Sequence, residues 1–298
     1  MSENRQLCII ESPFQLIQLY EYLKYKKLTQ VFVCIRLNKE VRNNSQLYAL
    51  VKLFSPEDWK IIYLKNPYTA LVVAFFYRCF CDYFVLGDEN SKVVKLFLPF
   101  LHKERITFLD DGVATLDSTS KYNRFTIFSQ IAGERNHMLE LRKMVESVKK
   151  TQRVVLLLGS KLTETGILDF KAYEELVKKV IISNRKEMRS DLKLVYVPHR
   201  GETAHKNILN DKFCQRYGVL IVENHLPVEL ISVEKGYDIK GVIGFFSTAL
   251  FTLRQIYPSA TVKVYLIPHE LLMKRKQKIK RLYQQLIEQG YKVCYLEH

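Results

Sequence analysis

Two adjacent carboxylates, Asp110 and Asp111, are followed by Gly112 and preceded by the apolar run 106–109. The run has the composition of a buried strand, so the carboxylates are predicted at its carboxyl end. In an open parallel sheet, ligands bind beyond the carboxyl ends of the strands. A carboxylate in that place can act as a general base. The competing interpretation is a polar turn that ends the strand, with Gly112 at positive φ.

Polar residues also stand at strand ends or helix starts in the second half of the chain. They are Pro198, His199 and Arg200 after the predicted strand 192–197, Glu229 in a short helix at 227–233, and Ser247 and Thr248 between the strand 241–246 and a helix. A helix start that carries hydroxyl groups favours an anion such as phosphate, and a histidine can donate a proton to phosphate near neutral pH. The competing interpretations are a helix cap for Ser247 and a structural role for His199.

Strands and helices alternate along the whole chain, which is typical of parallel βαβ units. Strands are expected at 7–10, 31–35, 61–64, 83–86, 106–109, 154–158, 192–197, 219–222, 241–246, 261–267 and 291–296. Helices are expected at 14–27, 45–54, 68–80, 90–100, 138–150, 173–188, 203–217, 227–233, 249–256 and 270–289. Ser12 and Pro13 mark the cap and first position of the first helix, and residues 115–135 are expected to be less regular than the rest.

The alternation falls into two sets of βα units, divided near residue 150. We therefore expect an α/β protein with domains at 1–150 and 151–298. Two Rossmann-like domains facing across a cleft, with a long C-terminal helix, describe the GT-B architecture of many glycosyltransferases. No Gly-x-Gly-x-x-Gly follows a predicted strand and no Walker A loop is present, which disfavours nicotinamide and P-loop chemistry.

Composition limits the kind of protein and its partners. The 298 residues are 48% hydrophobic and carry a formal net charge of +15, which predicts a sizeable core and an anionic partner: nucleic acid, an acidic membrane or a charged substrate. The six cysteines include no Cys-x-x-Cys pair, so we expect reduced thiols, no zinc site and a cytoplasmic location, without a signal peptide. The apolar window 71–86 contains Arg78 and Asp82 and is predicted to be a buried helix followed by a strand.

The set of motifs resembles that of bacterial GT-B sialyltransferases, namely the lipooligosaccharide sialyltransferases (glycosyltransferase family 52) and the bacterial polysialyltransferases. Those proteins carry an acidic-acidic-Gly motif, a His-Pro motif and a Ser-Ser/Thr motif. Asp110-Asp111-Gly112 matches the first and Ser247-Thr248 matches the third. The second departs, because proline precedes His199 instead of following it, and His225 is the alternative histidine for the phosphate. Glu11-Ser12-Pro13-Phe14-Gln15-Leu16 also resembles the first strand-turn of these enzymes.

The resemblance implies an inverting transfer of sialic acid, or a related nonulosonic acid, from its CMP-sugar to a hydroxyl of a bacterial surface glycan such as lipopolysaccharide or capsule. It implies Asp111 as the base, Asp110 as its like-charged partner, and His199 as donor to the departing phosphate. The donor-binding residues would be Ser247, Thr248, Glu229, Arg200, Pro198, Gly112 and Ser12. No Asp-x-Asp occurs, and one phosphate leaves, so neither a metal nor another cofactor is expected.

Two other functions stay open: a GT-B glycosyltransferase with a CMP-Kdo or UDP-sugar donor, and a non-catalytic nucleic-acid-binding protein. The second is disfavoured, and no nucleic-acid partner is expected, because the cations are spread widely without an RNA-binding motif. Cations crowd residues 274–281 beside an apolar stripe. That helix is either docked by its stripe or a peripheral contact with anionic lipid on the inner face of the membrane. The acceptor, an oligosaccharide or glycolipid, and the oligomeric state, with a homodimer as one option, are not determined by the sequence.

Overall fold

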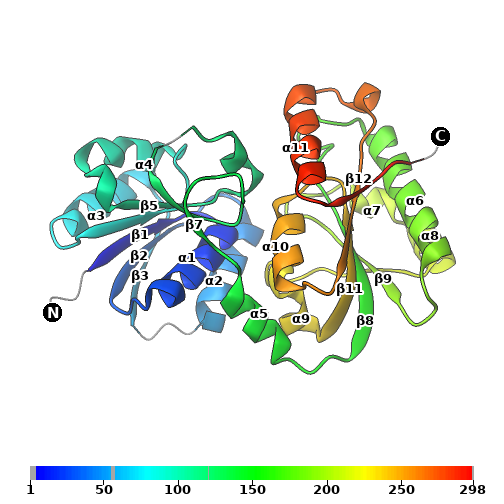
Figure 1. Cartoon of the computed structure of the whole chain (residues 1–298), viewed down its shortest axis with the longest axis horizontal. Helices are drawn as coiled ribbons and strands as arrows, with labels where there is room; N and C mark the ends of the chain where they lie inside the picture. Colours follow the sequence, from blue (N-terminus) through cyan, green and yellow to red (C-terminus); the bar gives the residue numbers. More distant parts are fainter. Residues whose placement is uncertain (1–4, 55–57, 120, 297–298) are drawn as a thin grey trace. The chain divides into compact units, whose positions relative to one another are not determined.

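The structure is a computed structural model that describes residues 5–54, 58–119 and 121–296. Residues 1–4, part of the segment for which no signal peptide is predicted, lie outside this description. The chain separates into two compact units (Figure 1). The first unit ends at Lys143 and also includes His225–Pro227, and the second holds Met144–Asn224 and continues from Val228. Each unit is built on one parallel sheet.

The sheet of the first unit has the strand order of a Rossmann fold. Its strands, in spatial order, are β3 (Trp59–Leu64), β2 (Val31–Arg36), β1 (Gln6–Ile10), β4 (Tyr83–Leu86), β5 (Ile106–Leu109), β6 (Asn123–Thr126) and β7 (Glu134–Arg135). All neighbouring strands run parallel. The order reverses between β1 and β4, which is the point where ligands bind in such sheets. The stretch at 115–135 is less regular, as predicted, but it also contains the short strands β6 and β7, which were not predicted.

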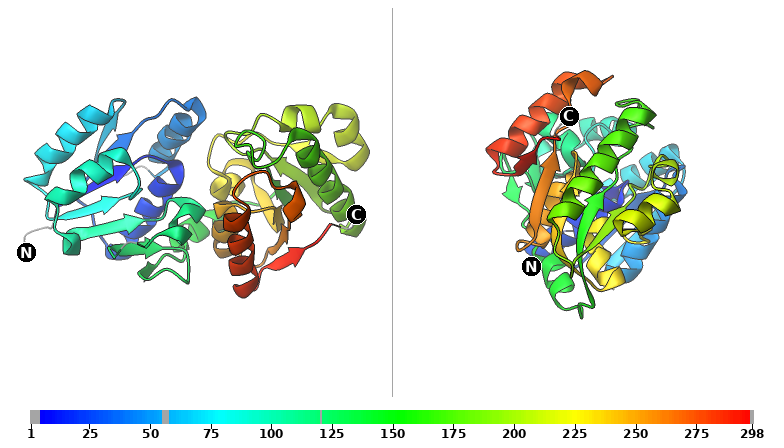
Figure 2. Two further views of the ribbon diagram at one scale, coloured as in Figure 1. Left: turned by 90° about the horizontal axis from the view of Figure 1, so that it is seen from above. Right: turned by 90° about the vertical axis from the view of Figure 1, so that its right-hand side faces the viewer.

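Helices cover both faces of this sheet (Figure 2). They are α1 (Pro13–Lys26), α2 (Val41–Phe54), α3 (Pro67–Arg78) and α4 (Lys92–Phe97), and α5 (Leu139–Glu146) follows where the first unit ends. Ser12 caps α1 and Pro13 is at its first position, as predicted. The helix predicted at 90–100 is shorter, because α4 ends at Phe97 and continues as a 3-10 turn. The helices α1 and α2 pack together, as do α3 and α4.

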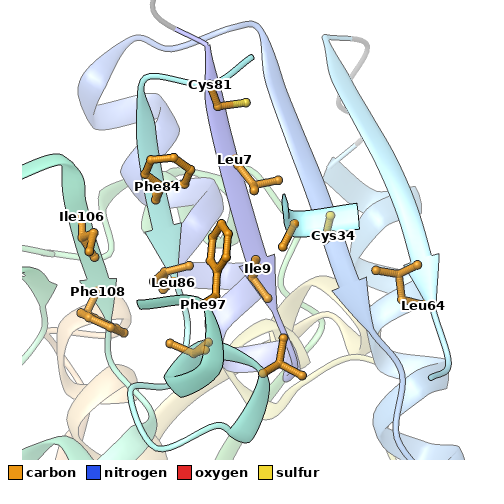
Figure 3. Close-up of a cluster of buried hydrophobic side chains, with 13 residues drawn as sticks. Leu7, Ile9, Cys34, Leu64, Cys81, Phe84, Leu86, Phe97, Ile106 and Phe108 are labelled. Atoms are coloured by element: carbon orange, nitrogen blue, oxygen red, sulfur yellow. The ribbon is translucent and has the colours of Figure 1, made fainter. Parts of the chain in front are cut away.

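The core between the sheet and the pair α3 and α4 explains the apolar strand runs (Figure 3). Leu7 and Ile9 of β1 belong to this cluster, together with Phe84 of β4, Phe97 of α4 and Phe108 of β5. The intervening residues of β1 are also buried. Because both faces of the strand are covered, its sequence is continuously apolar instead of alternating.

The second unit repeats the same strand order. Its sheet runs β10 (Val219–Ile221), β9 (Lys193–Val197), β8 (Gln152–Leu158), β11 (Tyr237–Gly244), β12 (Thr261–Tyr265) and β13 (Lys292–Cys294), again with parallel neighbours. The order reverses between β8 and β11. Its helices are α6 (Phe170–Glu187), α7 (His205–Ile208), α8 (Asp211–Tyr217), α9 (Ile231–Lys235), α10 (Thr248–Ile256) and α11 (Lys276–Glu288). Across both sheets, the predicted strand ends differ from the observed ones by at most four residues.

Two helix predictions in this unit need correction. The helix expected at 203–217 is divided, because Asn210 caps α8 by accepting a hydrogen bond from the Phe213 N–H at 3.0 Å. The C-terminal helix begins at Lys276 and not at 270. The apolar stripe of α11 is buried at Ile279, Leu282 and Leu286. The stripe therefore docks the helix, whereas the cations Lys274, Arg275, Lys278 and Arg281 are exposed and their contact with anionic lipid stays a prediction.

Candidate functional site

Asp111 is the second residue after β5, as predicted, and is exposed. Its Oδ1 atom accepts a hydrogen bond from Nε2 of Gln15 at 2.9 Å. Its backbone N–H donates to Oγ1 of Thr115 at 2.8 Å. Gly112 has a φ of 68°, the left-handed conformation that was predicted. The carboxylate of Asp111 is therefore held in a fixed orientation and is accessible to a solute.

Gln15 holds Asp111 and was missed as a functional residue. Its side chain is buried, and its Oε1 atom accepts from the Glu11 N–H at 2.8 Å, so its Nε2 atom points to Asp111. The amide fits because residue 87 is glycine: a Cβ atom on Gly87 would lie 2.1 Å from Oε1 of Gln15. The sequence shows only a glutamine in the first helical turn after the first strand, and neither its burial nor its partner can be seen there. The ends of β1, β4 and β5 thus converge on this amide.

Asp110 is fully buried, in contrast to its neighbour. Its Oδ2 atom accepts from the Ile127 N–H at 2.8 Å, which ties the end of β5 to the end of β6. Burial raises the pKa of Asp110 to about 6, against the lowering effect of the Ile127 and Thr126 hydrogen bonds and the Arg124 charge. The Asp110 carboxyl can therefore position the loop, whereas Asp111 is the carboxylate that a substrate can touch.

Glu11, directly after β1, is a second carboxylate that hydrogen bonds hold in place. Arg36 at the end of β2 donates two hydrogen bonds of 2.6 Å to Glu11, and the Ser91 hydroxyl donates a third of 2.7 Å. The hydrogen bond that Arg36 donates to Glu11 raises the pKa of Arg36. Ser12, the next residue, accepts from the Gln15 N–H at 3.3 Å. Its hydroxyl caps α1, and its predicted contact with the donor stays a prediction.

His199 lies in the loop after β9 and follows Pro198, as predicted. Its Nδ1 atom accepts a hydrogen bond from the Gly201 N–H at 3.0 Å. Because Nδ1 is an acceptor, the neutral ring carries its proton on Nε2. The ring can therefore present an N–H donor to an anion at Nε2.

Glu202 fixes the His199 loop and was also missed. Its buried Oε2 atom accepts from the His199 N–H at 3.0 Å, and its Oε1 atom accepts from the hydroxyls of Tyr173 and Tyr196. Burial raises the pKa of Glu202 to about 7, although these hydrogen bonds lower it. A Cβ atom on Gly159 would lie 2.0 Å from Oε2 of Glu202. A glutamate three residues after the histidine was the available signal.

Ser247 stands between the end of β11 and the start of α10. Its Oγ atom accepts from the Ala249 N–H at 3.2 Å, so it caps the helix, as the competing interpretation expected. Thr248 is the first residue of α10, and both residues are half-buried. The first turn of a helix has backbone N–H groups that no helical carbonyl accepts, and it attracts anions.

Glu229 lies in a 3-10 turn, Val228–Leu230, beside α10. It is buried, and its Oε1 atom accepts from the Thr252 hydroxyl at 2.9 Å. Burial raises the pKa of Glu229, and the positive charge of Arg200 lowers it. The structure therefore brings Arg200 and Glu229 into electrostatic contact. Ribose binding by Glu229 stays a prediction.

The sheet order explains how the second-unit residues assemble. Because β8 lies between β9 and β11, His199 and Ser247 flank the carboxyl end of β8, beside the point where the strand order reverses. An imidazole donor, a guanidinium and a helix N-terminus at one sheet edge suit an anionic group. His225, the alternative histidine, is exposed and groups with the first unit. Among residues 5–54, 58–119 and 121–296, no group of three His, Cys, Asp or Glu side chains could hold a metal ion.

Known proteins resemble this chain in sequence family and in fold. A family model described as alpha-2,8-polysialyltransferase matches residues 89–266, more than half of the chain. UDP-GlcNAc 2-epimerase from Methanocaldococcus jannaschii is similar in structure, with a TM-score of 0.56 and 12% identity over 98% of this chain and 88% of that one. A second UDP-N-acetylglucosamine 2-epimerase has a TM-score of 0.55 and 13% sequence identity, and the match covers 100% of this chain and 85% of that one. These likenesses confirm the predicted GT-B fold. No curated protein sequence matches the chain.

Proposed function

The chain belongs to the alpha-2,8-polysialyltransferase family and is a glycosyltransferase of the sialyltransferase type, and from this premise we propose that it uses a CMP-activated donor. The sugar is sialic acid or a related nonulosonic acid, and the acceptor is a hydroxyl of a bacterial surface glycan. The observation that carries the proposal is the His199 loop of the second unit. Its ring presents Nε2–H, and it flanks the same strand end as the start of α10.

On the donor side, the leaving group is CMP, which carries a single phosphate. His199 donates a hydrogen bond to a phosphate oxygen as the bond between that phosphate and the anomeric carbon breaks. The α10 N-terminus with Ser247 and Thr248 binds the other oxygens. Arg200 adds positive charge at the same edge. These groups supply the stabilisation of a leaving monophosphate, so no metal is needed in the proposal.

On the acceptor side, Asp111 removes the proton of the attacking hydroxyl. The acceptor oxygen forms its bond to the anomeric carbon while the bond to CMP breaks on the opposite face, so configuration inverts. The proton ends on Oδ2 or Oδ1 of Asp111, and CMP leaves as the anion. Gln15 holds Oδ1 at 2.9 Å and so keeps the carboxylate oriented. A positioned base of this kind contributes about 10²- to 10⁴-fold in rate.

A nucleotide screen separates this proposal from a GT-B enzyme with a UDP-sugar donor. We expect CMP to raise the melting temperature in buffer that contains EDTA, because a ligand at about 100 times its Kd stabilises the fold by about 2.7 kcal/mol. That corresponds to a shift of roughly 5 °C or more. UDP, GDP and NAD serve as controls. Stabilisation by UDP that requires added Mg²⁺, without any response to CMP, would contradict the proposal.

A further inference from the structure

The outer side of α3 exposes an apolar stripe. Tyr68, Val72 and Phe76 recur every four residues and are 75%, 68% and 62% exposed. Phe80, four residues further on, is half exposed. Residues at this spacing lie on one side of a helix. The prediction of a buried helix in this window was therefore wrong for its outer side, although Ala74 on the inner side is fully buried.

Exposed apolar residues also occur in α4 and in the 3-10 turn that follows it. Leu96 and Phe100 are also about half exposed. Phe75 connects this part to the core: its ring centroid lies 5.5 Å from that of Phe97 and 4.9 Å from that of Phe100. The rings of Phe76 and Phe80 are 5.3 Å apart. The exposed residues Tyr68, Val72, Phe76, Phe80 and Phe100 form an apolar patch, here termed the α3–α4 face.

A cationic hollow adjoins this face. It has a volume of about 320 Å³ and is lined by Arg78, His102 and Arg105 together with Phe84 and Phe100. All three basic side chains are exposed. The hollow lies at the amino ends of β4 and β5, opposite the strand ends that carry Asp111. It is therefore separate from the acceptor-side residues of the proposed transfer site. Two guanidinium groups and an imidazole suit a phosphate group.

The combination of apolar groups on the α3–α4 face and cationic groups in the adjoining hollow indicates which kind of partner binds there. A helix that lies in a membrane interface has an aromatic and aliphatic side flanked by basic residues. A second copy of this chain, at a net charge of +15, would place like charges against the Arg78 and Arg105 groups. No helix in the described part of the chain is long and apolar enough to cross a bilayer. Most of the apolar stripe of α11 is buried, so that helix exposes less apolar surface than α3 does.

We propose that the α3–α4 face binds the surface of an anionic phospholipid bilayer, with lipid phosphate in the hollow between Arg78, His102 and Arg105. The apolar residues enter the headgroup region, and the basic residues pair with the phosphates. The chain thereby lies on the membrane without spanning it. This attachment goes beyond the proposed transfer reaction and does not depend on the identity of the donor.

Vesicle sedimentation of the full chain tests the attachment. The wild type is expected to sediment with vesicles of phosphatidylcholine and phosphatidylglycerol, and much less with phosphatidylcholine alone. Val72→Glu with Phe76→Glu is expected to lower the partition coefficient by at least about tenfold. Arg78→Gln with Arg105→Gln, which leaves the apolar patch intact, is expected to lose most of the preference for anionic vesicles.

The matched control introduces two glutamates at exposed apolar residues of the second unit. Met273 and Tyr295 are 63% and 70% exposed, and Met273→Glu with Tyr295→Glu is expected to sediment like the wild type. Equal sedimentation of the wild type and both α3–α4 face variants would overturn the proposal. So would a wild-type dimer that Val72→Glu with Phe76→Glu converts to a monomer, with no vesicle binding by either. Transfer to a small soluble acceptor, measured on the same samples, tests the proposed function separately.

Discussion

Asp111→Asn is expected to lower the rate of sialic acid transfer by about 10²- to 10⁴-fold and to leave CMP affinity nearly unchanged. Asparagine keeps the size of the side chain and an oxygen for the Gln15 amide, but it cannot take a proton from the acceptor hydroxyl. The loss corresponds to about 3 to 5 kcal/mol of transition-state stabilisation. The turnover rate and the Kd for CMP, measured separately, distinguish this outcome from a binding defect.

Asp117→Asn is the matched control, because Asp117 is an exposed aspartate in the same 3-10 segment as Gly112. We expect near-normal turnover from this variant. Asp110→Asn differs from both, since Asp110 is buried and bonded to the Ile127 N–H. Its effect is expected in the melting temperature and not in the proton transfer, because the Asp110 carboxyl is buried. If Asp111→Asn keeps more than about a third of wild-type turnover, Asp111 is not the base.

His199→Ala is expected to slow transfer by about 10²- to 10³-fold and to weaken CMP binding at the same time. The imidazole is proposed to touch the phosphate in the ground state and in the transition state, so both quantities depend on it. The Nδ1 contact with the Gly201 N–H at 3.0 Å places the neutral proton on Nε2, where it can be donated. Steady-state kinetics together with CMP titration by calorimetry measures both effects.

His225→Ala serves as the control for the loss of a histidine near a strand end. His225 is exposed and groups with the first unit, so its removal is expected to leave CMP affinity unchanged. A reversed pattern, with normal kinetics in His199→Ala and a large loss in His225→Ala, would assign the phosphate contact to His225.

The strand pattern and the motif positions could be predicted from the sequence because they depend on local information. β1, β5 and β8 are covered on both faces, and this requires continuous apolar runs that the sequence displays. The cap at Ser12 also depends on neighbouring residues alone. In contrast, β6 has the sequence Asn-Arg-Phe-Thr and contains two polar side chains that are buried through tertiary contacts, Arg124 and Thr126. Such a strand shows no apolar run.

The residues that hold the proposed catalytic groups could not be predicted, because their partners are distant in sequence. Gln15 meets Asp111 across 96 positions of the chain, and it fits only beside a glycine at position 87. Glu202 is close to His199 in sequence, but its burial depends on Tyr173 from α6 and on Gly159 after β8. The exposed side of α3 was missed because the hydrophobicity of a helix does not show whether another element covers it.

Direct transfer tests the proposed function most decisively. The chain is incubated in buffer containing EDTA with CMP-sialic acid and a fluorescent oligosaccharide that ends in α-2,8-linked sialic acid. The products are separated, and their masses are measured by mass spectrometry. We expect products heavier by whole sialic acid residues, with release of one CMP for each residue added. Absence of product from CMP-sialic acid, while CMP-Kdo or a UDP-sugar yields product with the same preparation, would contradict the assignment of the donor.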